Sequence, residues 1–319
     1  MARKNGSDVT AEVVVVGAGP AGLTAAIALA ASGIETALVA RRPDRADNRT
    51  SALLAGSVTA LEVLGVWEAC RTRAAPLRTI RLVDDTQRLL RAPQVSFSAS
   101  EIGLEAFGYN IENIHLVAAL EARATALAPL ARIDAAAQTV SLGERGIAVE
   151  LEDGRSIAGR LAIGADGRKS LCRAAAGIAT EGFTYPQAAL TLNFAHSRPH
   201  RDVSTEFHGE TGPFTLVPLP GDRSSLVCVV TPAEAERLAA LDPDPLAQTI
   251  EQRAHSILGK VAVEPGRGVF QLAVETAQRF AANRIALVGE AAHVVPPIGA
   301  QGLNLGLRDA ATIGELAVA

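Results

Sequence analysis

The chain has 319 residues, of which 48% are hydrophobic and 20% are charged, and its formal net charge is −4 at pH 7. This length is sufficient for two domains or one large domain, and the composition is typical of a soluble globular protein. The charge gives no indication of a nucleic-acid partner. No run of about twenty apolar residues is present to span a membrane, and the first ten residues lack a signal-peptide core. We therefore expect a cytoplasmic protein, with peripheral contact at the inner face of a membrane left open.

The first motif lies between a predicted strand and a predicted helix. Val13–Val16 is a β-branched run, which is typical of a strand buried on both faces. Gly17, Gly19 and Gly22 follow with the spacing G-x-G-x-x-G, and an alanine- and leucine-rich helix continues to Gly33. In such a turn the first glycine permits the bend, the second lets a phosphate approach, and the third lets the helix pack on the strand. The pattern predicts a dinucleotide with its pyrophosphate at the helix N-terminus, and a turn that binds nothing is the alternative.

The second strand of this unit departs from the usual pattern. Ile34–Val39 reads as the strand, but the acidic residue that normally follows and binds the adenosine ribose is replaced by Ala40, with Arg41 next. Thr50–Cys70 has the apolar spacing of an amphipathic helix, and Arg49 stands at its start. Because a cation is unfavourable at a helix N-terminus, we expect Arg49 to pair with a surface acid or with a cofactor.

The middle of the chain contains hairpins, one helix and a second strand–turn–helix motif. Residues 161–178, LAIGADGRKSLCRAAAGI, place Asp166 and Gly167 where a strand ends, and Asp166 has an alternative role as a helix N-cap. The other predicted elements are a hairpin over 76–93 with strands Thr79–Val83 and Arg88–Arg91, a helix Asn113–Thr125, and a hairpin of Thr139–Leu151 with Ser156–Ile163.

Residues 185–277 change character, because short strands with turns between them replace the alternation of strands and helices. The predicted strands are Ala189–Phe194, Val203–His208, Phe214–Val217, Ser225–Val230 and Gly268–Val274, with helices Pro232–Ala240 and Pro245–Leu258. A buried strand, Arg284–Val288, then resumes the first pattern and leads to Gly289, Glu290 and a glycine-rich loop before a last helix. We therefore predict an α/β fold, a Rossmann-like domain into which an α+β domain with an antiparallel sheet is inserted.

Three separated motifs resemble one family when they are taken together. They are GAGPAG at 17–22, GADG at 164–167 and GEAAHVVPPIGAQGLNLGLRDA at 289–310. The chain is similar to the class A flavoprotein monooxygenases, the aromatic hydroxylases of the para-hydroxybenzoate hydroxylase fold. Within that family, residues 48–70 and the closing GLNLGLRDA look most like the ubiquinone-biosynthesis hydroxylases.

The resemblance implies that FAD is the resident cofactor and that NADPH or NADH is a transient reductant. Glu290 stands where the family usually has Asp to hold the ribityl chain, Pro297 lies near the flavin ring, and His293 has a structural place. No catalytic residue is assigned. Because the acid at Ala40 is missing, we expect FAD to be held loosely at its adenosine end. The implied cofactor-binding residues are Gly17, Gly19, Pro20, Ala21, Gly22, Arg41, Arg49, Asp166, Gly167, Gly289, Glu290, Pro297, Gly299, Gly302, Leu303 and Asn304.

The resemblance also implies an activity and its partners. A C4a-hydroperoxyflavin formed from reduced flavin and O2 would hydroxylate a small aromatic substrate, here a polyprenylated phenol of ubiquinone biosynthesis. The alternatives are a flavin-binding scaffold or fragment without hydroxylase activity, and an aromatic hydroxylase with a small soluble substrate. Contact with a membrane, with a quinone-synthesis complex or with a second copy stays open. The three cysteines fit no metal spacing, so no metal is expected.

The implied domains are discontinuous. Residues 1–75, 96–180 and 278–319 form the expected FAD-binding domain, and residues 76–95 and 181–277 form the expected substrate domain. Family members usually continue for several dozen residues beyond Ala319, so the family's C-terminal tail is expected to be absent. Five apolar side chains on the inserted strands are the expected wall of the substrate pocket, with ordinary core packing as the alternative: Leu192, Phe194, Phe207, Phe214 and Leu216.

Overall fold

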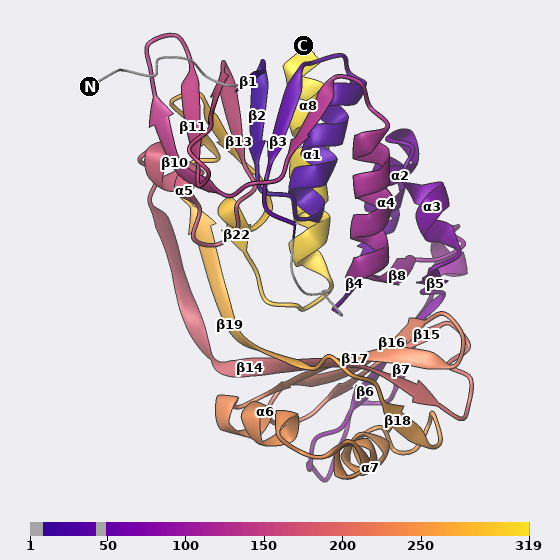
Figure 1. Cartoon of the computed structure of the whole chain (residues 1–319). Coiled ribbons are helices and arrows are strands. Elements are labelled where there is room, and N and C mark those ends of the chain that lie inside the picture. The colour runs from indigo at the N-terminus through magenta and orange to yellow at the C-terminus, as the bar shows by residue number, and fades with distance from the viewer. Residues whose placement is uncertain (1–8, 43–48, 319) are drawn as a thin grey trace.

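The computed structural model describes residues 9–42 and 49–318. Figure 1 shows an upper layer built on a parallel sheet and a lower layer built on a larger mixed sheet. Two long strands, β14 (Thr180–His196) and β19 (Gly268–Ala277), pair with each other and run from one layer into the other. The α/β fold with a second, mostly antiparallel sheet agrees with the prediction from the sequence.

The parallel sheet of the upper layer has the strand order β20-β21-β13-β2-β3-β9. All four residues of β2 are buried, because both faces of this sheet are covered. The predicted strand at 13–16 is therefore confirmed with the same bounds. The strands are β2 (Val13–Val16), β3 (Thr36–Val39), β9 (Leu130–Ile133), β13 (Leu161–Gly164), β21 (Ile285–Leu287) and the antiparallel edge β20 (Ala281–Ala282).

Three helices cover one face of this parallel sheet, and a smaller sheet covers the other. α1 (Pro20–Ala31), α4 (Asn113–Thr125) and α8 (Gln301–Val318) share one apolar core with β2. The second core lies under a four-stranded sheet and α5 (Leu171–Ala175). The strands of that sheet are β1 (Val9–Thr10), β12 (Ser156–Gly159), β11 (Ile147–Leu151) and β10 (Ala137–Leu142). The hairpin predicted over 139–163 around Asp153-Gly154 is confirmed, since β11 and β12 pair antiparallel across that turn. Its strand bounds are wrong, because each half divides into two strands.

The segment 50–70, which was predicted to contain an amphipathic helix, begins with a strand. Residues 50–54 form β4, which pairs with β8 (Gly108–Glu112) in a three-stranded sheet with β5 (Ala74–Pro76). A side chain at Gly108 would lie 2.1 Å from the carbonyl oxygen of Leu53, so glycine allows this close pairing. Two short helices follow, α2 (Ala55–Val63) and α3 (Trp67–Arg71). Arg49 therefore precedes a strand and does not stand at a helix N-terminus.

The lower layer is a nine-stranded sheet with the order β22-β19-β14-β17-β16-β15-β6-β7, in which β18 also pairs with β14. Helices α6 (Pro232–Ala239) and α7 (Pro243–Arg253) pack on one of its faces. Short 3₁₀ helices, η1 (Ala99–Ile102) and η2 (Gly289–Ala291), flank the sheet. The remaining strands are β6 (Thr79–Asp84), β7 (Val95–Ser98), β15 (Val203–His208), β16 (Pro213–Leu219), β17 (Arg223–Val230), β18 (Val261–Val263) and β22 (His293–Val294).

The hairpin predicted over 76–93 exists, but its second strand lies further along the chain. β6 pairs antiparallel with β7, so residues 95–98 take the place expected for Arg88–Arg91. The Asp84 carboxylate accepts hydrogen bonds from the backbone N–H groups of Thr86, at 3.1 Å, and Ala92, at 2.8 Å. These bonds close residues 85–92 into a loop, which is why the arginine-bearing segment is not a strand.

Candidate functional site

The first and second glycine motifs are in direct contact at the ends of β2 and β13. A side chain built on Gly17 would lie 2.2 Å from the carbonyl oxygen of Ala165, and Gly17 has a φ of +107°. A side chain built on Gly22 would lie 2.0 Å from the carbonyl oxygen of Gly17 and 2.9 Å from the Cβ of Ala165. Both positions therefore require glycine, because any larger residue would separate the two strand ends.

The third motif packs against the same turn. Gly289 has a φ of +59°, and a side chain there would lie 3.1 Å from the Cβ of Ala21. A side chain built on Gly306 would lie 3.2 Å from that same Cβ and 3.2 Å from the Cα of Gly289. The N-terminal turn of α1, η2 and α8 are thus in van der Waals contact, and motifs from three distant parts of the sequence meet at one place.

The N-terminus of α1 is open at this junction. Gly19 is the N-cap residue, no side chain caps the helix, and Pro20 occupies the first turn. Nothing lies within 4 Å of a side chain built on Gly19, in contrast to Gly17 and Gly22. The exposed N–H groups and the positive end of the helix dipole therefore face free space, which is the arrangement that binds a pyrophosphate.

Asp309 holds the third motif in its conformation. Its Oδ2 accepts a hydrogen bond from the Gly289 N–H at 3.0 Å and lies 2.6 Å from Nε2 of the buried His293. Glu290, between these two anchored residues, is exposed. The predicted structural role of His293 agrees with this geometry. Asp309 was not among the predicted site residues, although it lies in the GLRDA segment, because its two partners are apparent only from the fold.

The acid of the second motif is bonded to the start of α5. Asp166 accepts hydrogen bonds from the Ser170 hydroxyl at 2.5 Å and from the Cys172 N–H at 3.1 Å. Ser170 is the N-cap of α5, so the Asp166 carboxylate supports the N-terminal turn of that helix, close to the alternative weighed from the sequence. Burial, with a further contribution from the Asp166 charge, raises the pKa of the Cys172 thiol. Gly167 continues the turn with a φ of +78°.

The loop before α8 is exposed, whereas the start of the helix itself is tied down. Pro297 and Gly299 are exposed, and Gly302 has only the Val295 side chain within 4 Å of a built side chain. Asn304 is buried and makes four hydrogen bonds to protein groups. Its Oδ1 accepts from the Leu54 N–H and the Ser57 hydroxyl, and its Nδ2 donates to the carbonyls of Ala52 and Ala300. The Asn304 side chain is therefore occupied, and the half-buried Leu303 beside it packs against the core.

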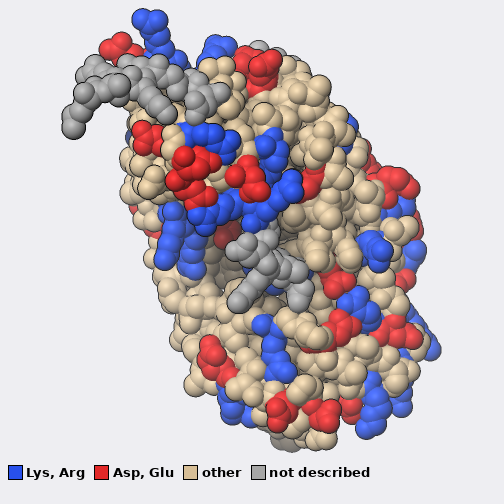
Figure 2. All heavy atoms as spheres, in the orientation of Figure 1, with Lys and Arg blue, Asp and Glu red and all other residues tan. Residues whose placement is uncertain are grey.

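The end of β3, where the family acid is missing, is surrounded by ion pairs. Arg41 pairs with Glu152, and the Arg42 N–H donates to Asp134 at 2.9 Å. The Ala40 carbonyl accepts from Nη1 of Arg132 at 2.6 Å, while Nη2 of Arg132 is buried and has no hydrogen-bond partner. Figure 2 shows such basic and acidic side chains interspersed on one face of the molecule. Arg41, one of the two arginines predicted to bind the cofactor, is thus already paired with an acid.

The side chains predicted to line the substrate pocket do not lie on the sheet face that turns toward the upper layer. The five residues expected to form the substrate-pocket wall are all buried in the core that α6 and α7 cover. That prediction is wrong, because their neighbours in sequence alternate to the other face. The residues on the opposite face include Tyr185, Ala189, Val227 and Phe270. The guanidinium of Arg49 lies over the Phe270 ring, 5.2 Å from its centre, so Arg49 contacts the sheet.

The two layers are joined by an ion-pair cluster. The Arg223 guanidinium, from β17, donates to both carboxylate oxygens of Glu112 at 3.1 Å and to Glu264 at 2.6 Å. The hydrogen bonds from Arg223 hold the pKa of Glu112 below its ordinary value, and its two acidic partners raise the pKa of Arg223. Because Glu112 lies immediately before α4, this cluster sets the position of the upper layer over the sheet.

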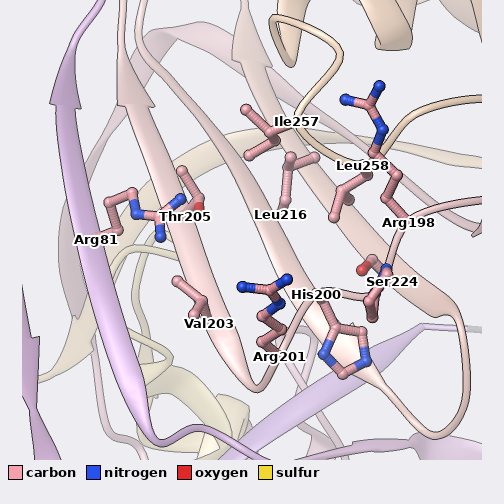
Figure 3. A pocket seen from close by; sticks show the side chains of 11 residues that line it. Arg81, Arg198, His200, Arg201, Val203, Thr205, Leu216, Ser224, Ile257 and Leu258 are labelled. Atoms are coloured by element: carbon pink, nitrogen blue, oxygen red, sulfur yellow. The ribbon is translucent and has the colours of Figure 1, made fainter.

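A well-defined cavity lies on the covered side of the sheet. It has a volume of about 290 Å³ and is lined by basic residues, among them Arg81, Arg198 and Arg201 (Figure 3). Its other walls include Leu216, which packs on the α7 side, and the loop residues Ile257 and Leu258. The sheet therefore separates this cavity from the three-motif junction.

The comparisons with known proteins agree with this geometry. The sequence profile of the family described as "FAD binding domain" matches residues 10–317. Ubiquinone hydroxylase UbiL of Rhodospirillum rubrum is 34% identical over 98% of this chain and 73% of its own length. The 3-demethoxyubiquinol 3-hydroxylase of Escherichia coli is 30% identical over 93% of this chain and 77% of its length. The chain belongs to the FAD-dependent flavoprotein monooxygenases.

Solved structures show the same fold. A variant of Pseudomonas aeruginosa PqsL with four substitutions superposes with a TM-score of 0.79 at 24% identity, and the match covers 97% of this chain and 86% of that chain. Aklavinone-11 hydroxylase, in a ternary complex with FAD and aklavinone, superposes with a TM-score of 0.78 at 24% identity over 98% of this chain and 63% of its own. The N-terminus of α1 has room for the FAD pyrophosphate, because nothing lies within 4 Å of a side chain built on Gly19. Any real side chain at this position would fill that space.

The described residues contain neither a membrane-spanning helix nor a cluster of metal ligands. No helix in residues 9–42 and 49–318 is long and apolar enough to cross a bilayer. Over the same residues, no group of three or more His, Cys, Asp or Glu side chains is placed to hold a metal ion. The free cysteines Cys70, Cys172 and Cys228 are buried, and burial raises the pKa of Cys70 to about 11.

Proposed function

We propose that this FAD-dependent monooxygenase hydroxylates the ring of a polyprenylated phenol in ubiquinone biosynthesis, with NADPH or NADH as the reductant. The observation that carries the proposal is the junction of the three motifs around the open N-terminus of α1. The similarity to ubiquinone hydroxylases of two bacteria supports the substrate class.

In this proposal FAD supplies the redox and oxygen-transfer chemistry, and the chain holds and shields it. The backbone N–H groups of the first turn of α1 would bind the pyrophosphate through Gly19, Pro20 and Ala21. Glu290 would accept a hydroxyl hydrogen bond from the ribityl chain, since its exposed carboxylate lies between two anchored residues. The loop of Pro297–Gly299 would lie along the flavin ring.

The roles of the remaining predicted residues follow from their contacts. Asp166, Gly167 and Asn304 would shape the site through the backbone, because the two side chains are hydrogen-bonded to protein groups. Arg49 would border the substrate, since its guanidinium stacks on Phe270. Arg41 would reach the adenosine end only by leaving Glu152.

We also propose that the two layers correspond to two functional domains. The upper layer would bind FAD through residues 1–75, 96–180 and 278–319, and the lower layer would bind the substrate through residues 76–95 and 181–277. The sheet face that carries Tyr185, Val227 and Phe270 would then take the place of the pocket wall expected from the sequence. A small homo-oligomer or a quinone-synthesis complex is compatible with this division.

One experiment tests the proposed function. The purified chain is reconstituted with FAD, its visible flavin absorbance is recorded, and NADPH or NADH oxidation is followed with and without a prenylated phenol. We expect bound flavin and a phenol-dependent increase in reductant oxidation, with a hydroxylated product identified by mass spectrometry. Flavin without hydroxylation would favour the scaffold alternative. Hydroxylation of only short, water-soluble phenols would contradict the prenylated substrate.

A further inference from the structure

Exposed apolar side chains are concentrated in one segment of the chain. Of the sixteen large hydrophobic residues that are exposed among those the structure describes, six lie between residues 89 and 104. Leu89 is 100% exposed and Leu90 is 87% exposed, so both side chains project fully into solvent. The other four are Val95, Phe97, Ile102 and Leu104. Such a concentration of exposed apolar side chains in one short segment indicates an interaction site.

The loop that carries the two leucines is held in shape from its base. The Asp84 carboxylate accepts the N–H and hydroxyl of Thr86 and the N–H of Ala92. These bonds, with the one to Ala92 contributing most, lower the pKa of Asp84 to about 2. Asp85 accepts a 2.8 Å hydrogen bond from His255, which ties the loop to the segment after α7. The chain therefore presents Leu89 and Leu90 outward instead of folding them onto the sheet.

In this segment the acids have hydrogen-bond or ion-pair partners, whereas two arginines have no ion-pair partner among the described residues. Five described acids bond to the segment, lie within it or adjoin it, and all have partners within the protein. They are Asp84 and Asp85 as described above, Glu101 in the capping box of η1, Glu105 with Arg78, and Glu210, which accepts from the Gln87 N–H at 3.2 Å. Arg88 and Arg91 flank the two leucines, and neither forms an ion pair with an acid in the described residues, although the Arg88 charge contributes to the lowered pKa of Asp84. The outward surface of the tip is therefore apolar at its centre and positive at its edges.

We propose that residues 85–104 dock on an anionic lipid bilayer, with Leu89 and Leu90 inserted among the acyl chains and Arg88 and Arg91 at the lipid headgroups. An apolar tip bordered by cations is complementary to such a surface. A two-fold contact with a second copy would bring the like-charged arginines of the two tips together, whereas the acids nearby are already bonded within their own copy. The inference rests on the proposed function, since a polyprenyl tail keeps its phenol in the bilayer.

The position of the segment supports this orientation. Phe97 of β7 pairs with Ile80 of β6, which pairs with Ser204 of β15. Ser204 adjoins the pair Thr205–Leu216, so the same sheet face continues through Val217, the neighbour of Leu216, to its partner Ser225. The Ser225 hydroxyl accepts a 2.9 Å hydrogen bond from Thr50 of the upper layer. The apolar face of β7 is therefore the same sheet face that turns toward the three-motif junction.

The test compares vesicle binding by the full FAD-reconstituted chain and its variants in co-sedimentation assays. The vesicles are phosphatidylcholine alone or phosphatidylcholine with roughly one-third phosphatidylglycerol. We expect the wild-type chain to bind the anionic vesicles, and Leu89→Asp/Leu90→Asp to bind at least tenfold more weakly. Arg88→Gln/Arg91→Gln should bind both vesicle types equally. Val63→Asp, which changes an apolar residue that is 82% exposed on α2, is the matched control and should bind like the wild type.

Other outcomes would overturn the proposal. They are wild-type protein that ignores anionic vesicles, leucine variants that bind unchanged, and a concentration-dependent dimer in light scattering that the leucine variant abolishes. The last result would identify a second copy as the occupant. Flavin absorbance and NADPH oxidation with a short-chain phenol are recorded for every variant and should stay at wild-type values. Loss of these signals in the wild type would refute the proposed function, whereas loss of vesicle binding alone would refute only the docking surface.

Discussion

The three-motif junction and the nine-stranded sheet present different kinds of group to a ligand. At the junction, glycines at 17, 19 and 22 bring backbone N–H groups together, and the only exposed acid described there is Glu290. On the sheet, side chains form the surface that a ligand would meet, and residues adjacent in sequence point to opposite faces. Phe194 is buried against α6 and α7, whereas Phe270 is 39% exposed on the other face. A backbone-built site tolerates little variation in residue type, and a side-chain-built face can change without loss of the fold.

The largest expected effect comes from comparing substitutions on the two faces of the nine-stranded sheet. Phe194→Ala should lower the free energy of unfolding by about 3–5 kcal/mol, because it leaves a cavity in the covered core. Phe270→Ala should lower it by less than about 1 kcal/mol but raise KM for the phenol. Chemical denaturation and steady-state kinetics measure the two effects. Equal destabilisation by both variants would refute the assignment of the faces.

A second pair of variants, both on α1, distinguishes an effect on FAD binding from an effect on stability. Gly19→Val should weaken FAD binding by roughly 100-fold or more, since the new side chain fills the pyrophosphate space, and the apo-protein Tm should not change. Gly33→Ala, at the other end of α1, has a φ of +84° and should cost about 1 kcal/mol of stability while FAD binding is kept. Fluorescence titration with FAD and calorimetry give both quantities. Stoichiometric FAD in Gly19→Val would contradict the proposed pyrophosphate site.

The contact between the two layers gives an intermediate effect. Arg223→Ala leaves Glu112 and Glu264 without their partner, and the expected cost is about 2 kcal/mol after allowance for the 31% exposure of the arginine side chain. Arg237→Ala removes an exposed pair within α6 and should leave the Tm unchanged. Thermal unfolding monitored by circular dichroism compares them. A Tm for Arg223→Ala equal to that of Arg237→Ala would show that the cluster does not hold the layers together.

The same cluster predicts a dependence on pH. The folded pKa of Glu112 lies below its unfolded value, so its contribution to stability is complete above about pH 4.5 and is lost as the pH falls through the folded pKa. Glu112→Gln should therefore flatten the fall in stability below pH 4.5. Denaturation curves over this range, for wild type and variant, provide the measurement. Parallel pH profiles would remove Glu112 as a source of the acid sensitivity.

The smallest expected effect concerns the adenosine end of the junction. Ala40→Glu would restore a carboxylate beside the unpartnered Nη2 of Arg132, where it can accept a ribose hydroxyl. One added hydrogen bond of about 1 kcal/mol corresponds to roughly fivefold tighter FAD binding. Isothermal titration of the apo-protein with FAD measures this. Unchanged or weaker affinity would mean that neighbouring residues such as Asp134 already serve the ribose.

Much of the fold followed from local pattern. The valine run at 13–16 and the helix at 113–125 have the predicted bounds, because a continuous β-branched run and an amphipathic helical period are each strong local signals. The structure of residues 50–70 was not predictable from local pattern, since the first five residues pair with β8 instead of forming helix. Tertiary pairing there outweighs helical propensity, which is worth only tenths of a kcal/mol per residue.

The sequence by itself determined the family and the position of the dinucleotide turn, because glycine spacing constrains the backbone locally. Only the tertiary structure decided which sheet face meets the upper layer, that Asp309 anchors Gly289 and His293, and that the Asp166 and Asn304 side chains are already bonded. Those facts depend on contacts between residues far apart in the chain, which no local pattern encodes. The same holds for the exposed leucines at 89 and 90, whose outward direction is fixed by the bonds of Asp84.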